Sequence, residues 1–263
     1  MTGAIIHLTS AHGAPGVTTT AMLIAASWPG SVVIEADPGG GVIGARHDLG
    51  ADPGLMSLAG VLRHGPTEVA LEDHAQRLAG GVDVVCAPPS GEHVASALRR
   101  IATRDVANAL RGCGRPLLVD GGRAQPGPVG HDLMAHADLV VWFCRSDLAE
   151  LAVLRQRIAR CGGQRVALVG EDPYDAAEVS HALGGLAVTP VPLDDGAASV
   201  VTRGAPRRRL RRSRLRRAVA ELVEVLMEDL AAGRPTGRSR DDTYRHLDER
   251  AQVPVTDTGD VFA

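Results

Sequence analysis

The chain has 263 residues, 44% of them apolar, a net charge of −3 and no lysine, so that all 28 basic residues are arginines. This length and apolar content suffice for a full core, and no apolar run reaches the roughly 18–20 residues that cross a membrane. We therefore expect one large domain in the cytoplasm, and the lack of lysine excludes Schiff-base chemistry.

The four cysteines show neither metal-site nor C-x-x-C spacing. They are Cys86, Cys113, Cys144 and Cys161. Three of them fall in or beside apolar segments, so we expect buried or incidental thiols rather than a zinc or redox site.

Short β-branched runs alternate with helical patterns along the chain, which is typical of βαβ units. The predicted strands are Ile5–Thr9, Val32–Ala36, Val82–Ala87, Pro116–Asp120, Leu139–Cys144, Arg165–Val169 and Leu186–Val191. The predicted helices between them are Thr18–Ala26, Leu55–Arg63, His93–Arg111, Leu148–Arg160 and Asp175–Leu183. Because βαβ crossovers are right-handed, we expect an α/β fold: a doubly wound, mostly parallel sheet of about seven strands with helices on both faces. Ligands of such folds bind at the carboxyl ends of the strands.

The end of the chain predicts a long helix over about 205–231 and then a tail. An apolar stripe on this helix should pack on the body of the protein. The stripe consists of Leu215, Val219, Leu222, Leu226 and Leu230. Residues 1–232 are therefore expected to form one domain, and residues 233–263, which are polar and of mixed charge, a disordered tail.

The first strand leads into a glycine-containing loop and a helix that opens on three threonines. The segment from Ala11 to Thr18 has the spacing of the phosphate-binding pattern G-x-x-x-x-G-K-[ST], with alanine for the first glycine and Val17 for the lysine. Backbone N–H groups that converge at a helix N-terminus bind phosphate. The predicted nucleotide-binding residues are His12, Gly13, Ala14, Pro15, Gly16, Val17, Thr18 and Thr19.

Two acids end the strands that would flank this loop. Asp37 precedes Pro38 and three glycines, and Asp120 precedes two glycines. Asp120 could hold Mg²⁺ through its water shell, with the Thr18 hydroxyl as a direct ligand, and Asp37 could position an attacking water. The alternative is that both acids only cap turns. Glu35 is expected to be structural, in a strand-end network with Asp37.

These motifs, in this order, resemble those of the ParA/MinD class of deviant P-loop ATPases. The resemblance covers residues 4 to about 230 and rests on the segments AHGAPGVTTTA, VIEADPGGG, LLVDGG, ADLVVWFCRSD and LAVTPVPLDDGAA. The residues that match are Gly13, Gly16, Thr18, Thr19, Asp37, Pro38, Asp120 and either Asp194 or Asp195. The resemblance implies ATP and Mg²⁺ as cofactors and a homodimer that encloses the nucleotide. The arginine-rich composition suggests a divergent, actinobacterial-like branch.

The chain departs from the family at both lysines of the loop. His12 stands where the family has its signature lysine, Val17 stands at the phosphate-binding lysine, and Pro15 removes a backbone donor. Each lost lysine removes a charge-assisted hydrogen bond of ~1.5–3 kcal/mol and transition-state stabilisation. We therefore expect nucleotide binding with weak or absent hydrolysis. Protonated His12, Arg123 or Arg145 could approach the phosphates, and the alternatives are an exposed histidine and a solvated strand end.

A run of arginines precedes the apolar stripe of the last helix. It consists of Arg203, Arg207, Arg208, Arg209, Arg211, Arg212, Arg214, Arg216 and Arg217. Since these nine carry +9 and the chain −3, the rest carries −12. Arginines without aromatic or groove-reading residues favour sequence-independent, salt-dependent DNA binding, whereas a membrane helix would show large apolar residues opposite the charges. The alternative is a solvated basic face that pairs with Glu221, Glu224 and Glu228.

Three functions are consistent with this pattern. The first is a ParA/MinD-like partitioning or positioning protein that binds ATP and Mg²⁺, dimerises and touches DNA, with nucleoid association as a consequence. The second is a pseudo-ATPase scaffold that acts through a protein partner without nucleotide. The third is a metabolic P-loop enzyme of the dethiobiotin-synthetase or nitrogenase-iron-protein kind, against which the lack of lysine and of paired cluster cysteines argues.

Overall fold

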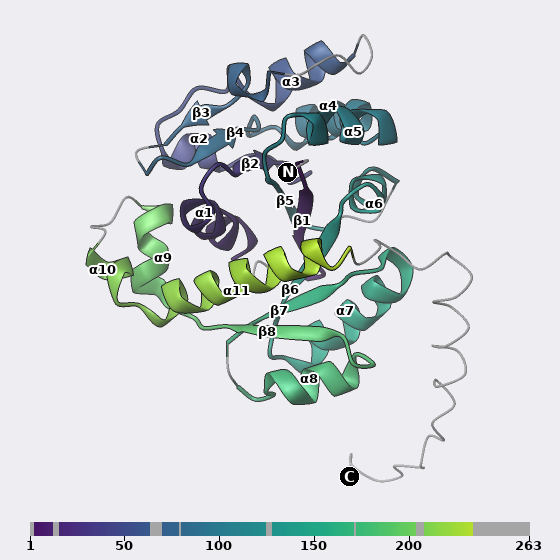
Figure 1. Cartoon of the computed structure of the whole chain (residues 1–263), viewed down its shortest axis with the longest axis vertical. Helices are drawn as coiled ribbons and strands as arrows, with labels where there is room; N and C mark the ends of the chain where they lie inside the picture. The colour runs from purple at the N-terminus through teal and green to yellow at the C-terminus, as the bar shows by residue number, and fades with distance from the viewer. Residues whose placement is uncertain are drawn as a thin grey trace, which may run out of the picture.

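A computed structural model describes residues 3–12, 16–63, 70–78, 80–124, 128–170, 172–203 and 208–233. Its centre is a sheet of eight described strands in the order β3-β4-β2-β5-β1-β6-β7-β8 (Figure 1). The strands are β1 (Ile5–Ser10), β2 (Val32–Glu35), β3 (Gln76–Arg77), β4 (Asp83–Val85), β5 (Leu117–Arg123), β6 (Leu139–Arg145), β7 (Arg165–Val169) and β8 (Ala187–Val191). All neighbours pair in parallel except β3 with β4.

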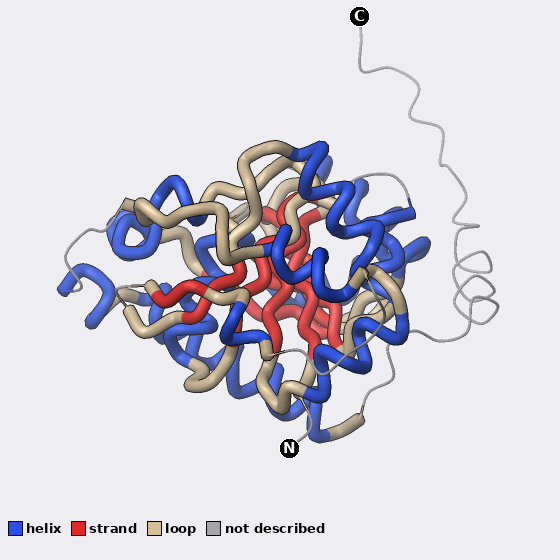
Figure 2. The backbone as a smooth tube through the Cα atoms, turned by 90° about the horizontal axis from the view of Figure 1, so that it is seen from above, coloured by secondary structure: helices blue, strands red, loops and turns tan. Residues whose placement is uncertain are grey.

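Helices cover both faces of the sheet, as a doubly wound fold requires, and Figure 2 shows the strands enclosed by them. The helices are α1 (Val17–Ser27), α2 (Ile43–Arg46), α3 (Leu55–Leu62), α4 (Gly91–Ile101), α5 (Arg104–Gly112), α6 (Pro128–Ala135), α7 (Leu148–Cys161), α8 (Ala176–Ala182), α9 (Asp195–Thr202), α10 (Arg208–Arg211) and α11 (Arg214–Ala231), with a 3₁₀ turn η1 (Leu71–Asp73). Buried side chains of α1, α2, α9 and α11 form one apolar cluster with the sheet, and those of α3 to α7 form the other.

The seven predicted strands are confirmed, and the structure adds the two-residue strand β3 at one edge. Such a short polar strand carries no alternating pattern, so the sequence does not reveal it. The prediction of one helix over His93–Arg111 is wrong, because Thr103 accepts a hydrogen bond from the N–H of Val106 at 3.3 Å and starts a second helix. Helices α2, α6 and α9 were not predicted.

The predicted helix over about 205–231 is also divided. Ser213 caps α11 by accepting a hydrogen bond from the N–H of Arg216 at 3.0 Å, which separates α10 from α11. The apolar stripe of α11 is buried as expected from Leu215 to Leu226. Near its end, Asp229 accepts hydrogen bonds from Arg165 of β7 at 2.8 and 3.0 Å, which ties α11 to the sheet. Residues 234–263 of the expected tail lie outside the described residues.

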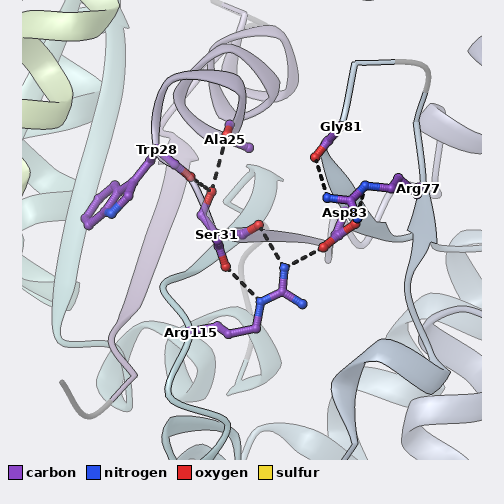
Figure 3. Close-up of polar contacts among 8 residues, drawn as sticks. Ala25, Trp28, Ser31, Arg77, Gly81, Asp83 and Arg115 are labelled. Atoms are coloured by element: carbon purple, nitrogen blue, oxygen red, sulfur yellow. Dashed lines mark hydrogen bonds and ion pairs between the residues drawn. The ribbon is translucent and has the colours of Figure 1, made fainter.

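Contacts of Arg115 connect the amino ends of three strands (Figure 3). The predicted ligand site lies at the opposite, carboxyl ends of the strands. The Arg115 guanidinium donates to the Gly30 carbonyl at 2.8 Å and forms an ion pair with Asp83, which also pairs with Arg77 at 3.4 Å. Ser31 donates to the Trp28 carbonyl at 2.8 Å. These contacts fix the starts of β2, β4 and β5, and hence the register that brings their carboxyl ends together.

None of the helices in the described ranges is both long enough and apolar enough to span a membrane.

Candidate nucleotide site

The predicted phosphate loop connects β1 to α1, and its described parts have the geometry of an open helix N-terminus. Gly16 stands before α1 with φ 86° and ψ 28°, a left-handed conformation that favours glycine, and as the N-cap residue it provides no side-chain cap. Among the described residues, the first N–H groups of α1 are thus left uncapped, as at a helix N-terminus that binds a phosphate. His12 is exposed. Residues 13–15 (Gly13, Ala14 and Pro15) lie outside the described residues.

Val17 belongs to the apolar core rather than to the loop surface. Its side chain is 4% exposed and lies in the cluster that contains Ile6, Ala21 and Val33. A valine in this environment offers no charge to a phosphate. Thr18 and Thr19 are half-buried at the start of α1, so the loop keeps its hydroxyls but supplies no cation at the lysine position.

Asp120 is fully buried on β5, and one of its carboxylate oxygens lacks a partner. The Gly122 N–H donates to Oδ1 at 3.2 Å, whereas Oδ2 has no described group at hydrogen-bond distance. The pKa of this carboxyl is raised to about 7, mainly by burial. The Thr18 hydroxyl and the Gly122 N–H lower the pKa, and the charges of Glu35 and Asp37 raise it further. A buried oxygen without a partner is costly, so this position suits a cation or a water held by one.

Asp37 follows β2 and packs against the bend of the neighbouring strand. Its Oδ1 accepts from the Gly39 N–H at 2.7 Å. Burial raises the pKa of the Asp37 carboxyl, while the Gly39 hydrogen bond and the charge of Arg123 lower it. A Cβ on Gly122, where φ is +54°, would lie 1.9 Å from Asp37 Oδ2. Only glycine at this bend lets the two strand ends bring Asp37 and Asp120 to one place.

Glu35 is structural, as the sequence predicts, although its partners differ from the expected ones. Its 1% exposed side chain accepts hydrogen bonds from the N–H groups of Val42, Ile43 and Ala87 at 2.5, 2.9 and 2.9 Å. These groups belong to the loops after β2 and β4 rather than to Asp37. Glu35 therefore fixes the backbone around the site, and both of its carboxylate oxygens accept hydrogen bonds from backbone N–H groups.

The described residues alone do not form a metal site. No cluster of three or more His, Cys, Asp or Glu side chains in the described ranges could hold an ion. Mg²⁺ in P-loop sites takes oxygens from a threonine, from water and from the nucleotide phosphates, with an aspartate outside the first shell. The unpartnered Asp120 oxygen near Thr18 fits that arrangement.

His7 is a buried polar residue that the sequence reading did not single out. It lies on β1, its Nδ1 has no partner among the described groups, and its ring packs against Gly121, where a Cβ would lie 2.6 Å from Nε2. Burial lowers the pKa of the imidazole to about 4, so His7 is neutral at pH 7. The apolar run of β1 could have indicated that His7 is buried. The sequence does not show that Gly121 lies beside it.

Two further positions of the predicted motifs prove to be helix starts. Asp194 caps α9 by accepting from the N–H of Ala197 at 2.8 Å, and Asp195 is the exposed first residue of that helix. Asp147 caps α7 in the same way, next to the exposed Arg145. Asp194 and Asp147 thus have local structural roles.

The arginine segment lies at the junction of α9, α10 and α11. Its exposed members are Arg203, Arg209, Arg211, Arg212, Arg214, Arg216 and Arg217. Arg207 and the side chain of Arg208 lie outside the described residues. Apart from Arg214, none of these exposed arginines forms an ion pair with a described acid, so the expected alternative of pairing with Glu221, Glu224 and Glu228 is not seen there.

Comparison with known proteins shows a similarity of fold to solved structures at low sequence identity. No family model and no curated protein matches the chain. Among solved structures, a ParA family ATPase from Chlorobium tepidum TLS aligns over 85% of this chain and 98% of its own, with 15% identity and a TM-score of 0.70. The cell division ATPase MinD of Pyrococcus furiosus aligns over 86% and 99%, with 16% identity and a TM-score of 0.67.

A third solved structure adds a bound nucleotide in its own site. The septum site-determining protein MinD of Pyrococcus horikoshii, complexed with Mg-ADP, aligns over 88% of this chain and 98% of its own, with 15% identity and a TM-score of 0.65. The likeness predicted from the motifs is thus confirmed at the level of the fold: the chain has the α/β fold of ParA/MinD-type P-loop proteins.

Proposed function

We propose that this chain is a ParA/MinD-like positioning protein that binds Mg-ATP and hydrolyses it slowly or not at all. The observation that supports this proposal is the buried Asp120 carboxyl, whose Oδ2 has no hydrogen-bond partner among the described groups. This carboxyl lies on β5, near Thr18 at the start of α1. A fold without a ligand here would gain stability by replacing Asp120 with an apolar residue.

Each remaining group of the site has a role in nucleotide binding. The N–H groups at the start of α1 would donate hydrogen bonds to phosphate oxygens, and the Thr18 hydroxyl would be a ligand of Mg²⁺. Asp120 would hold a water of the ion, and Asp37 would hold the water that attacks the γ-phosphate. Mg²⁺ supplies positive charge between the phosphates and these carboxylates. MinD of Pyrococcus horikoshii holds Mg-ADP on the same fold.

Val17 accounts for slow hydrolysis. In the proposed complex no side chain of this loop places a positive charge between the β- and γ-phosphates, because Val17 is packed in the core. Loss of one preorganised charge-stabilising group costs about 10²–10³ in rate. The protein would therefore remain in the ATP-bound state for long periods, and a stable homodimer around the nucleotide is expected.

The first experiment is a calorimetric titration of the full chain with ATP and Mg²⁺. We expect micromolar binding that Thr18→Ala weakens by about tenfold or more, since the variant removes a metal ligand. Thr202→Ala is a matched control, because the Thr202 hydroxyl only bonds the Ala198 carbonyl within α9. No heat at millimolar ATP would refute the proposed nucleotide binding.

The arginine segment supports non-specific DNA binding as part of the same proposal. Exposed arginines without acidic partners neutralise phosphates, and each contact contributes about 0.9 to the slope of log K against log salt. Charge reversal of Arg211 and Arg212 to glutamate should abolish binding of a labelled duplex at 50 mM salt, whereas the same reversal of the exposed Arg99 and Arg100 on α4 should leave most of it. Equal losses would show that only net charge matters.

A nucleotide-free scaffold is the second candidate, and the burial of Val17 favours it. The double change His12→Lys with Val17→Lys tests between the two. If Asp37, Asp120 and the loop are placed for catalysis, the restored lysines should raise ATP hydrolysis well above that of the unaltered chain. If the doubly substituted protein folds and still ignores ATP, the carboxylates serve stability and the chain acts through a protein partner.

A further inference from the structure

We propose that the Arg123 guanidinium contacts the nucleotide phosphates and contributes a positive charge that the loop itself lacks. This inference rests on the proposed nucleotide binding and assigns the cation that the site needs. Because the chain has no lysine, only arginine provides a permanent positive charge to the site.

The strand order places Arg123 between the strand that leads to Asp37 and the strand that leads to the phosphate loop. β5 lies between β2, which leads to Asp37, and β1, which leads to the phosphate loop. Arg123 is the last residue of β5 and is paired in register with Ser10, the last residue of β1. The Ala124 N–H donates to the Ser10 carbonyl at 2.9 Å, which fixes this pairing. The Arg123 backbone is therefore held beside the strand end from which the loop departs.

The bend before Arg123 lies against Asp37, and the charge of Arg123 acts on that carboxyl. The pairing register of β1 with β5 shifts between Leu8 and Ser10, where the Gly121–Gly122 bend of β5 lies against β1. Asp37 packs directly against Gly122. Burial raises the pKa of Asp37, and the charge of Arg123 makes a smaller contribution that lowers it. No described acid comes within 4.0 Å of the guanidinium to form an ion pair. The exposed guanidinium thus has unused donors at the site.

Other cations near the loop are less suited to this role. His12 is exposed, and an imidazole does not carry a permanent positive charge. Arg145 ends β6, on the side of β1 away from Asp37 and Asp120. Arginine presents two parallel N–H groups to phosphate oxygens, so a single side chain can bridge neighbouring phosphate groups.

The test is calorimetric titration of Arg123→Ala, Arg123→Lys and Arg100→Ala with Mg-ATP and with Mg-ADP, at 50 and 300 mM salt. We expect Arg123→Ala to weaken Mg-ATP binding by about tenfold or more, with a smaller effect at high salt, and Arg123→Lys to recover part of the loss. Arg100 is exposed at the far end of α4 and carries the same charge, so Arg100→Ala should bind like the unaltered chain.

The outcomes separate this inference from the proposed function. If the unaltered chain binds Mg-ATP and Arg123→Ala binds it equally well, the role of Arg123 is refuted while nucleotide binding stands. An equal loss at both salt concentrations, without recovery in Arg123→Lys, also refutes it, because the effect would then be structural rather than electrostatic. If the unaltered chain binds no nucleotide, the proposed function fails and the role of Arg123 fails with it.

Discussion

The buried carboxyl of Asp120 should make the stability of the nucleotide-free protein fall with rising pH. Its pKa in the folded state is about 7, against an ordinary value of 3.8. A group whose folded pKa is raised binds its proton more tightly when folded, so stability is intact below about pH 4 and is lost as the pH rises towards 7. The penalty is about 2 kcal/mol at pH 5 and about 4 kcal/mol at pH 8.

Urea unfolding of the unaltered chain and of Asp120→Asn, from pH 5 to pH 8 without nucleotide or metal, measures this effect. Asparagine has nearly the same shape as aspartate but does not bind or release a proton in this pH range. The stability of the unaltered chain relative to the variant should therefore fall by about 2–3 kcal/mol from pH 5 to pH 8. Asp105→Asn is a matched control, since Asp105 is exposed on α5. Mg-ATP should reduce the pH dependence of the unaltered chain but not that of Asp120→Asn.

A difference in stability that stays constant from pH 5 to pH 8 would refute this reasoning. Such a result would mean that Asp120 is ionised in the folded protein at no cost, for example because water reaches Oδ2. The inference that the site awaits a cation would then lose its basis.

Three other changes test the surrounding structure. Glu35→Gln should lower the free energy of unfolding by about 2 kcal/mol or more in urea melts, because an amide oxygen cannot accept the three backbone N–H groups as strongly as a carboxylate does; an unchanged midpoint would contradict the structural role of Glu35. Gly122→Ala should displace Asp37 and weaken Mg-ATP binding, since the new Cβ would lie 1.9 Å from its carboxylate, and unaltered affinity would show that the bend adapts. Asp229→Asn should destabilise the fold by about 3–5 kcal/mol by removing the ion-pair partner of Arg165, whose side chain is only 11% exposed, whereas a loss below about 1 kcal/mol would mean that α11 is held by its apolar stripe alone.

The α/β architecture could be predicted because the patterns that specify it are local. Runs such as Val32–Glu35 and Leu139–Arg145 are too apolar to lie anywhere but in a buried sheet, and they alternate with helical periods. The helix breaks that the sequence did not reveal depend on single hydrogen bonds that the side chains of Thr103 and Ser213 accept from backbone N–H groups. A helix interior also tolerates such side chains. Whether such a residue caps a helix or continues it is decided by what the segment packs against.

For the site, the sequence by itself determined which chemical groups are present and in what order: a threonine after a phosphate-type loop, two acids at strand ends and no lysine. Only the tertiary structure decided their state. It buries Val17 in the core, commits Glu35 to backbone N–H groups and leaves one oxygen of Asp120 without a partner. It also places Arg123 beside Ser10. The physical reason is that burial and hydrogen-bond partners depend on contacts between separate segments of the chain, such as Ser10 with Arg123, which form only when the parallel strands pair.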